Sequence, residues 1–444
     1  MDRRKFLGLM AASGLGFLVA PKAMAEDNES STPVLFPVPS NTGIAGNIVV
    51  VGGGMAGATM AKYLRLWGGT GVKVTLVEMS SAYTSNIMSN TVLNGRRDLA
   101  SLDYTYDTLV GHYGVTVVHA EVTDIDPTAK RVYLDTGVSM SYDRLVLAPG
   151  LQFDLLPGMT SLSEYDTLIP HAWKAGAQTQ LLRDQLVALP DGDDVIMTIP
   201  LAPYRCPPGP YERACVIADW LKVNKPRSRI IVLDANADII VEKENFSHAF
   251  NVTHAGVVDY RAGCTLTDVD STNLVISYTR GGIPDRVEAG VINPIPPQRA
   301  PQLLADVGLL NSPNGRFAAV NVLSYESTAK PGIHVIGDAS HTTQPKAGHI
   351  GNQQAKTCAD AILRLLSQKQ PDPAPVTNSA CYTPITSTTA TWLSAVYQYD
   401  PVTKTMVIPA QHNTGKAIAA LAATTENYSD MQTWFNTLMG DTFS

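Results

Sequence analysis

The feature that most constrains the fold is a glycine-rich turn between two segments of regular structure. Residues 47–51 read NIVVV, which predicts a buried strand, and the next six residues read GGGMAG. Residues 58–66 then predict a helix, and residues 72–77 predict a second strand that ends in Glu78. A strand, a glycine turn, a helix, and a strand with a terminal acid, in this order, indicate a dinucleotide-binding βαβ unit.

Each part of this unit has a predicted role toward a dinucleotide. Gly52 permits the tight turn, Gly54 lets the backbone approach a pyrophosphate, and Gly57 lets the helix pack closely on the strand. The start of the helix, with Met55 and Ala56, would stabilise phosphate charge. The acid that ends the second strand would accept hydrogen bonds from ribose hydroxyls. The alternative is a glycine-rich loop without a ligand.

Two later motifs favour FAD over NAD as the ligand. Residues 142–150 read YDRLVLAPG and resemble the strand and turn that close the FAD domain of two-dinucleotide-fold flavoproteins. Residues 332–339 read GIHVIGDA and resemble the second FAD signature of those proteins, in which the Asp contacts the ribityl chain. The residues expected at the cofactor from these motifs are Ala148, Gly150, Gly337 and Asp338.

The middle of the chain predicts a second dinucleotide-type domain without a phosphate site. Residues 194–199 predict its first strand, but the turn that follows, 200–208, reads PLAPYRCPP and contains no G-x-G-x-x-G. Prolines lack the N–H groups that bind a pyrophosphate. Residues 229–234 predict another strand of this domain. The sequence therefore argues against NAD(P)H as a substrate.

These segments predict an α/β protein with two Rossmann-like dinucleotide-binding domains, glutathione-reductase-like, and a small C-terminal α+β domain. Hydrophobic residues make up 45% of the 444 residues, enough for several cores. The predicted boundaries are 46–165 with 289–374 for a discontinuous FAD-binding domain, 166–288 for the second domain, and 375–444 for the C-terminal domain.

The N-terminus predicts export. Residues 3–7 read RRKFL, an apolar run follows to residue 20, and residues 23–25 read AMA, which is typical of a cleavage site. We expect a signal peptide at 1–25 of the twin-arginine type, although an ordinary secretion signal would share most of these features. Residues 26–45 are expected to be a mobile leader. The predicted location is the periplasm.

The charge and hydropathy of the chain limit the classes of molecule that it is expected to bind. The chain carries −7 and residues 1–25 carry +3, so the mature chain would carry −10, which argues against nucleic acid as a partner. No later run of 18 apolar residues predicts an integral membrane segment. The five cysteines are an odd number, so at least one is expected to be free or reactive in an oxidising compartment.

One stretch identifies a family resemblance. Residues 205–215, RCPPGPYERAC, are similar to the flavin-binding subunit of flavocytochrome c sulfide dehydrogenase. Other matching stretches are HAWKAG at 171–176, IPPQRA at 295–300, PKAG at 345–348 and the segment 434–443. The resemblance implies an enzyme that oxidises sulfide or another reduced sulfur compound at FAD and passes electrons to a c-type cytochrome subunit. This chain has no C-x-x-C-H, so haem c is expected on the partner alone.

Two positions depart from the family pattern. Ser85 matches the cysteine through which some members bind FAD covalently, so non-covalent FAD is expected here. The family also has a redox-active cysteine pair, whose first member matches Cys206. Ala318 is expected at the position of the second member, and Cys381 is expected to be structural. A persulfide mechanism on two cysteines is therefore in question.

Three residues are the catalytic candidates. Cys206 sits at a strand-to-helix turn, where a helix dipole would lower its pKa, although a buried apolar cysteine is the common alternative. Glu212 matches a family glutamate and would take a proton if burial raised its pKa, or would simply stabilise its own helix. Trp434 matches a tryptophan between flavin and cytochrome, with a core role as the alternative.

The remaining candidates concern the flavin. Lys346 precedes a predicted helix at 347–365 whose N-terminus would face the flavin, and a solvated surface lysine is the alternative. The other residues expected at the cofactor are Ser85, Asn90, Val122, Ala347 and Gly348. The nine histidines form no metal-binding pattern, so no metal site is predicted.

Two other functions remain open at this stage. A sulfide:quinone oxidoreductase would need an apolar C-terminal anchor, and residues 427–444 have scattered apolar residues instead. A binding or assembly subunit that keeps FAD for stability is the second alternative.

Overall fold

The glycine turn follows the first strand of the largest sheet, as the sequence predicts. In the computed structural model, which describes residues 35–410 and 415–444, β1 (Gly46–Val51) pairs in parallel with β2 (Val72–Val77) and β9 (Arg144–Leu147). β5 (Thr116–Val118) and β21 (Ile333–Val335) extend this parallel group on its two sides. The sheet is completed by β20 (Glu326–Ser327), β19 (Ala318–Asn321) and β22 (Ser340–His341).

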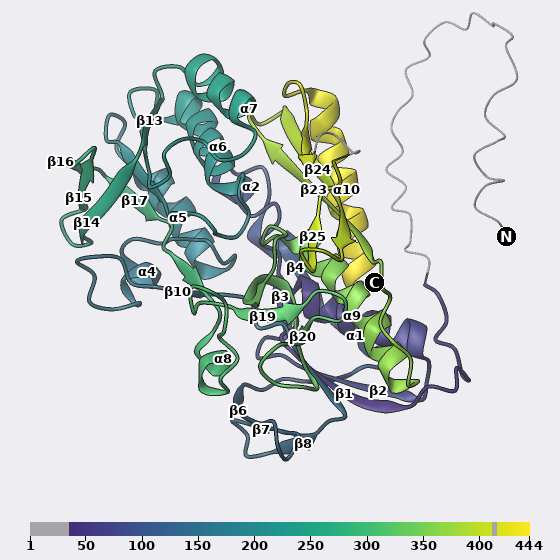
Figure 1. Cartoon of the computed structure of the whole chain (residues 1–444). Coiled ribbons are helices and arrows are strands. Elements are labelled where there is room, and N and C mark those ends of the chain that lie inside the picture. Colours follow the sequence, from purple (N-terminus) through teal and green to yellow (C-terminus); the bar gives the residue numbers. More distant parts are fainter. Residues whose placement is uncertain (1–34, 411–414) are drawn as a thin grey trace, which may run out of the picture. The chain divides into compact units, whose positions relative to one another are not determined.

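The first region also contains helices that pack beside the large sheet and short strands that form separate small sheets. The two long helices, α1 (Met55–Gly68) and α9 (Gly348–Leu366), pack against each other (Figure 1). The short helices are α2 (Asn90–Leu93), α3 (Asp107–Gly111) and α8 (Gln302–Asp306). The small strands are β3 (Ala82–Thr84), β4 (Asp103–Thr105), β6 (Val122–Asp126), β7 (Arg131–Leu134), β8 (Ser139–Ser141), β10 (Gln152–Phe153) and β18 (Gln298–Arg299).

A second parallel sheet forms the middle region, drawn in teal in Figure 1. Its four strands, in spatial order, are β13 (Val258–Ala262), β12 (Ile230–Asp234), β11 (Val195–Ile199) and β17 (Val291–Pro294). An antiparallel sheet of β14 (Cys264–Asp270), β15 (Val275–Arg280) and β16 (Ile283–Glu288) accompanies it. The helices here are α4 (Glu164–Thr167), α5 (Ala177–Ala188), α6 (Gly209–Asn224) and α7 (Lys243–His248).

The C-terminal region is a small sheet and one long helix. The sheet contains β23 (Val376–Pro384), β24 (Ala390–Asp400), β25 (Thr405–Val407) and β26 (Ile418–Ala419), and the helix is α10 (Thr425–Phe443). The two sets of parallel strands with covering helices and this added region confirm the predicted α/β class. No described helix has the length and apolarity that a membrane-spanning segment requires.

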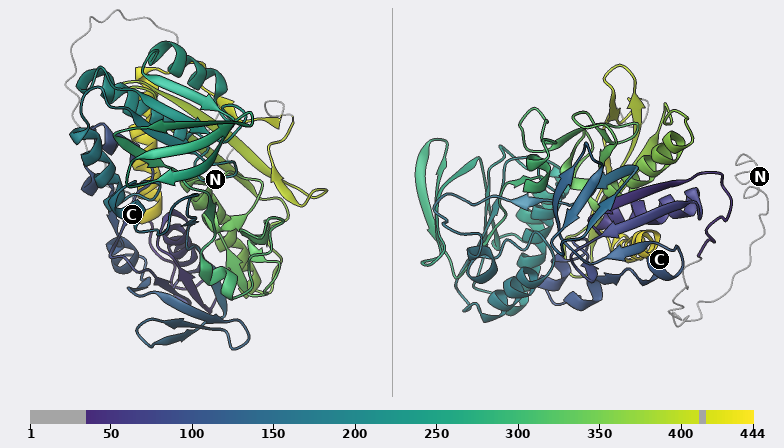
Figure 2. Two further views of the ribbon diagram at one scale, coloured as in Figure 1. Left: turned by 90° about the vertical axis from the view of Figure 1, so that its left-hand side faces the viewer. Right: turned by 90° about the horizontal axis from the view of Figure 1, so that it is seen from below.

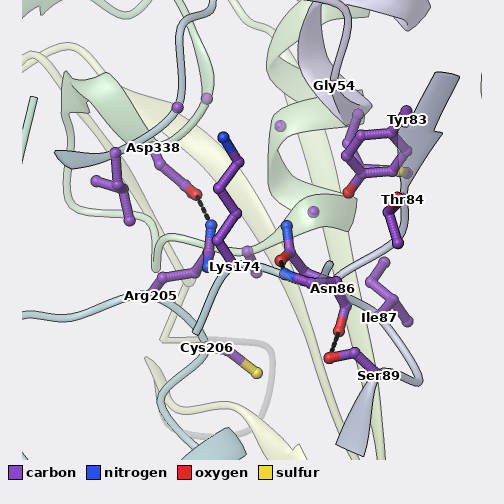
Figure 3. A pocket seen from close by; sticks show the side chains of 18 of the residues that line it. Gly54, Tyr83, Thr84, Asn86, Ile87, Ser89, Lys174, Arg205, Cys206 and Asp338 are labelled. Atoms are coloured by element: carbon purple, nitrogen blue, oxygen red, sulfur yellow. Dashed lines mark hydrogen bonds and ion pairs between the residues drawn. The ribbon is translucent and has the colours of Figure 1, made fainter. Parts of the chain in front are cut away.

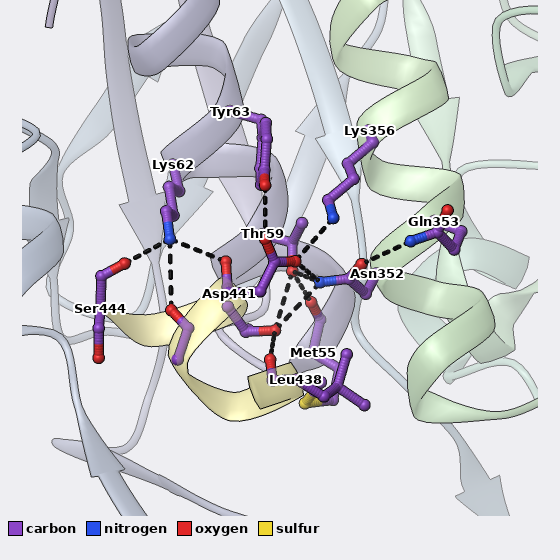
Figure 4. A network of polar contacts seen from close by, with 12 residues as sticks. Met55, Thr59, Lys62, Tyr63, Asn352, Gln353, Lys356, Leu438, Asp441 and Ser444 are labelled. Carbon is purple, nitrogen blue, oxygen red and sulfur yellow. Dashed lines mark hydrogen bonds and ion pairs between the residues drawn. The ribbon is translucent and has the colours of Figure 1, made fainter. Parts of the chain in front are cut away.

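The end of α10 is fixed to the first region by a polar network. Figure 2 shows this helix, in yellow, beside the purple α1. The Asp441 carboxylate accepts hydrogen bonds from the Tyr63 hydroxyl (2.5 Å) and the Asn352 amide (2.8 Å), and it pairs with Lys356 (2.7 Å) (Figure 4). Lys62 donates to backbone carbonyls in the last turn of α10. The network thereby ties α1, α9 and α10 together.

The structure revises the expected leader. The predicted signal peptide at 1–25 and the leader as far as residue 34 lie outside the described residues. Residues 36–45, expected to be mobile, are instead held against the first region. The Thr42 hydroxyl donates to the Gly68 carbonyl (2.5 Å), the Thr70 N–H donates to the Pro39 carbonyl (2.9 Å), and Ile44 packs on the core. Apolar contacts and backbone pairing outweigh the loop-like composition of this stretch.

Phe443 is expected to contribute strongly to the stability of this assembly. Its ring is 3% exposed and stacks on Tyr83 and Tyr104, with centroids 5.3 and 5.4 Å apart. We expect Phe443→Ala to lower the free energy of unfolding by about 3–5 kcal/mol in urea denaturation. Val402→Ala, at a position that is 88% exposed, should change it by less than about 0.5 kcal/mol. An equal effect of the two substitutions would contradict the packing described.

Candidate active site

One deep cavity of about 340 Å³ collects residues from all three regions (Figure 3). Its lining includes the glycine turn after β1, the segment 83–90, the loop that precedes α6, the start of α9, and β23. Fifteen predicted site residues line it: Gly52, Gly54, Met55, Ala56, Glu78, Asn90, Ala148, Gly150, Cys206, Glu212, Gly337, Asp338, Ala347, Gly348 and Trp434. The sequence motifs therefore converge on one cavity.

The glycine turn has the geometry of a dinucleotide cradle. Gly52 has a φ of 97°, a conformation that favours glycine. A Cβ on Gly57 would lie 1.7 Å from the Gly52 carbonyl oxygen, whereas a Cβ on Gly54 would meet nothing closer than 3.6 Å. Gly57 itself does not line the cavity, because its role is to let α1 approach the strand. The open side at Gly54 leaves the backbone accessible to a ligand.

Glu78 is positioned by the same turn. One of its carboxylate oxygens accepts the Gly53 N–H (2.6 Å), and the other accepts the Ser80 N–H (2.9 Å). The Tyr106 hydroxyl donates to the Gly53 carbonyl (3.1 Å), so an aromatic ring closes this end of the cavity. The sequence analysis did not single out Tyr106 or Tyr83, since an isolated tyrosine carries no motif.

At the other end of the cavity, two cysteines from distant parts of the chain share one wall. Cys206 comes from the loop before α6, and Cys381 comes from β23. The expectation for Cys381 as a structural residue is wrong, and so is the expectation that Ala318 occupies the position of the second cysteine. Ala318 is fully buried in β19, in the core below the large sheet, and does not line the cavity.

Burial governs the chemistry of both thiols. It raises the pKa of Cys206 well above its usual value, an effect to which the neighbouring Cys381 adds. It also raises the pKa of Cys381 to about 12. The helix dipole was expected to lower the pKa of Cys206, and this expectation is wrong because loss of water outweighs the dipole. When the two cysteines are reduced, both are therefore protonated thiols at neutral pH.

The loop that carries Cys206 is held by backbone contacts on both sides. The Cys206 N–H donates to the Lys346 carbonyl (2.7 Å), and the Trp173 indole N–H donates to the Arg205 carbonyl (3.2 Å). The Arg205 N–H donates to the Gln298 amide oxygen (2.8 Å). Cys206 has a φ of 57°, which is unfavourable for a residue with a side chain, so these contacts maintain a strained position.

Glu212 lies in the cavity wall as a buried acid. Its side chain accepts a hydrogen bond from the Asn90 amide (2.8 Å), and the residue is 8% exposed. Burial raises the pKa of Glu212 to about 8, which is the change that a proton-accepting role requires. Asn90 in turn accepts from the Arg213 guanidinium (2.8 Å), which also donates to the His171 carbonyl (2.7 Å). This network fixes the orientation of the acid.

Arg205 connects the thiol loop to the second FAD motif. Its guanidinium pairs with the Asp338 carboxylate (3.6 Å), as Figure 3 shows, and one of its nitrogens, Nη2, is buried without a partner among the described residues. Lys174, an exposed residue, also lines the cavity. Both cations lie within motifs that matched the family, and neither was chosen as a site residue from the sequence.

Besides Gly57, three predicted cofactor residues lie outside the lining. The Lys346 amine donates to the carbonyls of Asp338 (2.7 Å) and Ser340 (2.8 Å), so it points away from the cavity and is not a surface lysine either. The Ser85 hydroxyl donates to the Ile87 carbonyl (3.1 Å) in the interior. Val122 is buried in β6. Next to Ser85, Thr84 and Asn86 line the cavity instead, and next to Lys346, Ala347 does so.

Trp434 borders the cavity from α10. Its ring lies 5.5 Å from Tyr382 and 6.2 Å from His349, centroid to centroid, and both of these residues also line the cavity. Its buried indole N–H has no hydrogen-bond partner among the described residues. Trp434, Tyr382 and His349 therefore form a group of rings at the cavity. The described residues contain no group of three or more His, Cys, Asp or Glu side chains arranged to hold a metal ion.

Comparison with known families agrees with this architecture. Residues 46–186 match the pyridine nucleotide-disulphide oxidoreductase family. Residues 179–296 match the central part of the flavoprotein chain of sulfide dehydrogenase (flavocytochrome c). Together the two matches span residues 46–296, and the chain is similar to the two-dinucleotide-binding flavoproteins of the oxidoreductase class. Within that class it resembles the flavoprotein chain of flavocytochrome c sulfide dehydrogenase, and the resemblance inferred from the motifs is confirmed.

Individual relatives are more distant. The sulfide:quinone oxidoreductase of Aquifex aeolicus has a TM-score of 0.72 at 17% identity, covering 90% of this chain and 92% of its own. Putidaredoxin reductase, solved as a covalent complex with putidaredoxin, has a TM-score of 0.60 at 19% identity, covering 81% and 82%. These likenesses show the fold.

A curated relative aligns over a shorter stretch. An NADH dehydrogenase-like protein of Mycobacterium tuberculosis is 37% identical over 127 residues, which is 27% of this chain and 30% of the relative. The chain therefore spans about a third of the length of the curated relatives that it matches.

The cavity fits the FAD that the superfamily binds. The glycine cradle and Glu78 suit the adenosine and pyrophosphate, and Asp338 is at the position of the ribityl contact. The start of α9, at Gly348, faces the cavity and adds positive potential at the expected flavin end.

Gly57 provides a test of the cradle. Because a Cβ there would overlap the Gly52 carbonyl, we expect Gly57→Ala to reduce the molar ratio of flavin to purified protein more than tenfold, measured by absorbance after acid extraction. Gly440→Ala is the matched control, since a Cβ on that helical glycine meets nothing within 4 Å. A normal flavin content in Gly57→Ala would show that the turn does not bind the cofactor.

The raised thiol pKa has a measurable consequence. In the reduced protein, a group with a raised pKa is protonated below that value, so alkylation of Cys206 by iodoacetamide should be slow at pH 7 and should still increase above pH 9. The rate is followed by mass spectrometry of the Cys206 peptide, with N-acetylcysteine as the reference. A plateau below pH 8 would mean that the thiol is activated after all.

Proposed function

We propose that this protein is a periplasmic FAD-dependent oxidoreductase that oxidises sulfide or another reduced sulfur compound and passes the electrons to a separate c-type cytochrome. The observation that carries this proposal is the placement of Cys206 and Cys381 in one wall of the FAD-type cavity, with the buried acid Glu212 in the same wall. The family match of residues 179–296 supports the sulfur substrate.

A pair of cysteines supports a balanced sulfur-transfer cycle. With Cys206 and Cys381 joined as a disulfide, HS⁻ attacks one sulfur, a persulfide forms on that cysteine, and the other cysteine leaves as a thiolate. A second HS⁻ attacks the outer sulfur and leaves with it as HSS⁻, so both cysteines are then reduced. Two hydrosulfide ions thus yield HSS⁻, one proton and two electrons.

Glu212 is suited to the proton in this cycle. Burial raises the pKa of Glu212 to about 8, so the carboxyl group can gain and lose a proton near neutral pH. It accepts a proton from an incoming thiol or H₂S and releases it later in the cycle. Asn90 holds the carboxylate in place. Lys174 and Arg205 place positive charge at the same cavity, which favours entry of an anionic sulfur species. When bound, FAD supplies the two-electron acceptor that allows the disulfide to re-form.

FAD is proposed to be held non-covalently. The lining segment 83–90, which contains the position of the family's attachment cysteine, has no cysteine, and Ser85 stands at that position. Acid precipitation should therefore leave the flavin in the supernatant, and flavin that stays with the precipitated chain would contradict this.

The cytochrome partner is proposed to dock on the C-terminal region, residues 375–444. Trp434 and Tyr382 belong to this region, line the cavity and lie 5.5 Å apart, centroid to centroid, so they would provide an aromatic path for single electrons from the cavity to the partner. Export by the twin-arginine route, which carries folded proteins, suits a chain that takes up FAD before transport.

A quinone acceptor is the competing function, favoured by the fold of the Aquifex aeolicus enzyme. Anaerobic reduction of the holoprotein by sulfide, followed by addition of cytochrome c or a soluble quinone, distinguishes the two.

Substitution of each cysteine tests the proposed chemistry. We expect Cys206→Ser and Cys381→Ser each to slow flavin reduction by sulfide at least tenfold, equivalent to about 1.4 kcal/mol of barrier, in anaerobic stopped-flow absorbance. Cys264→Ala, in β14 and outside the cavity, is the control and should leave the rate unchanged. An unchanged rate in both serine variants would refute the thiol mechanism and leave Glu212 with the flavin.

A further inference from the structure

A second cavity, of about 540 Å³, is more open to solvent than the active-site cavity, and some of its lining residues are neighbours in sequence of residues that line the first. Helices α2 and α10 contribute residues to both cavities. On α2, Asn90 lines the first cavity and Thr91 the second, and on α10, Trp434 lines the first and Gln432 the second. Eight residues line this second cavity, and none of them is an acid. Two consecutive arginines, Arg96 and Arg97, are among them, in a chain that carries a net charge of −7.

The two arginines differ in how they are held. The Arg97 guanidinium donates to the Gln432 amide oxygen (2.7 Å) and lies 5.0 Å above the Phe435 ring, so its position is fixed against α10. Arg96 is exposed, and its guanidinium has no hydrogen bond or ion pair within residues 35–410 and 415–444. One cation is thus fixed in place, and the other is free to bind a ligand.

Neutral donors complete the lining. The hydroxyls of Ser387, Thr425 and Tyr428 have no intramolecular partner in the described part of the chain. Thr425 is also the first residue of α10, a helix of 19 residues, and the positive potential at its N-terminal end is partly offset by Glu426 in the first turn. The nearby acids are engaged or lie outside the lining: Asp219 accepts the Ser387 N–H (2.8 Å), and Glu426 does not contribute.

We propose that this cavity binds a small divalent oxyanion of the sulfate and thiosulfate class. A guanidinium presents two parallel N–H donors that match two oxygens of such an ion, and hydroxyls satisfy the others. A concave site of this size suits a small molecule, whereas acidic side chains of a protein partner are the competing occupant. The site would hold a sulfur oxyanion against elements that also line the redox cavity. The sulfur identity of the ion rests on the proposed function, whereas the binding of an oxyanion by these residues does not.

Isothermal titration of the holoprotein tests the site without turnover. Sulfate, which cannot reduce the flavin, is the first probe, in chloride buffer at constant ionic strength; thiosulfate and phosphate follow. We expect saturable binding of one ion per chain, weakened at least tenfold in Arg96→Gln and several-fold in Thr425→Val. Arg286→Gln removes an exposed arginine on β16 and should bind as the unchanged protein does. Flavin content and circular dichroism establish that each variant is folded.

The outcomes separate the alternatives. Preference for sulfate or thiosulfate over phosphate identifies a sulfur oxyanion, and equal binding of all three identifies a general oxyanion site; both support the proposal. No saturable heat with any probe, or equal affinity in Arg96→Gln, would overturn it. Loss of cytochrome association in Arg96→Gln with no anion binding in any form would also overturn it and would assign the cavity to a protein partner. Rates of sulfide oxidation are measured separately, so the two proposals can fail independently.

Discussion

The hydrogen bond from the Cys206 N–H to the Lys346 carbonyl is the contact on which the active site depends. It joins the loop before α6, in the middle region, to the residues just before α9, in the first region. Together with the hydrogen bonds of Arg205 to Trp173 and Gln298, it holds the strained backbone of Cys206 in place. The same contact explains why Lys346 faces away from the cavity: its backbone holds the thiol loop while its amine is occupied by two carbonyls.

This contact explains the role of the proline-rich turn after β11, which carries Cys206. In a nucleotide-binding domain, the turn at this position would present N–H groups to a phosphate. Here it presents a cysteine to the flavin end of the neighbouring domain, and prolines restrict the loop to that path. The parallel sheet of the middle region thus supports a thiol loop. The low polarity of the wall then raises the pKa of Glu212 and of both cysteines together.

Local motifs predicted the cofactor end of the site well, because their residues are close in sequence and their spacing sets the geometry. The glycine turn, Glu78 and Asp338 are of this kind. The partner of Cys206 could not be derived in this way: β23 lies 170 residues later, and pairing by motif position placed the second cysteine at Ala318. The pKa of Cys206 was also predicted in the wrong direction, since the helix dipole is visible in the sequence and burial is not.

The central claim is that Cys206 and Cys381 act as a pair. Peptide mapping of the oxidised holoprotein, digested without reduction and after blocking of free thiols, tests it most directly. The account predicts one linked species that joins the Cys206 and Cys381 peptides as a disulfide, which becomes two separate peptides with a persulfide on one cysteine after brief exposure to sulfide. Free-thiol labelling of both cysteines in the oxidised protein, with no linked species before or after sulfide, would contradict it.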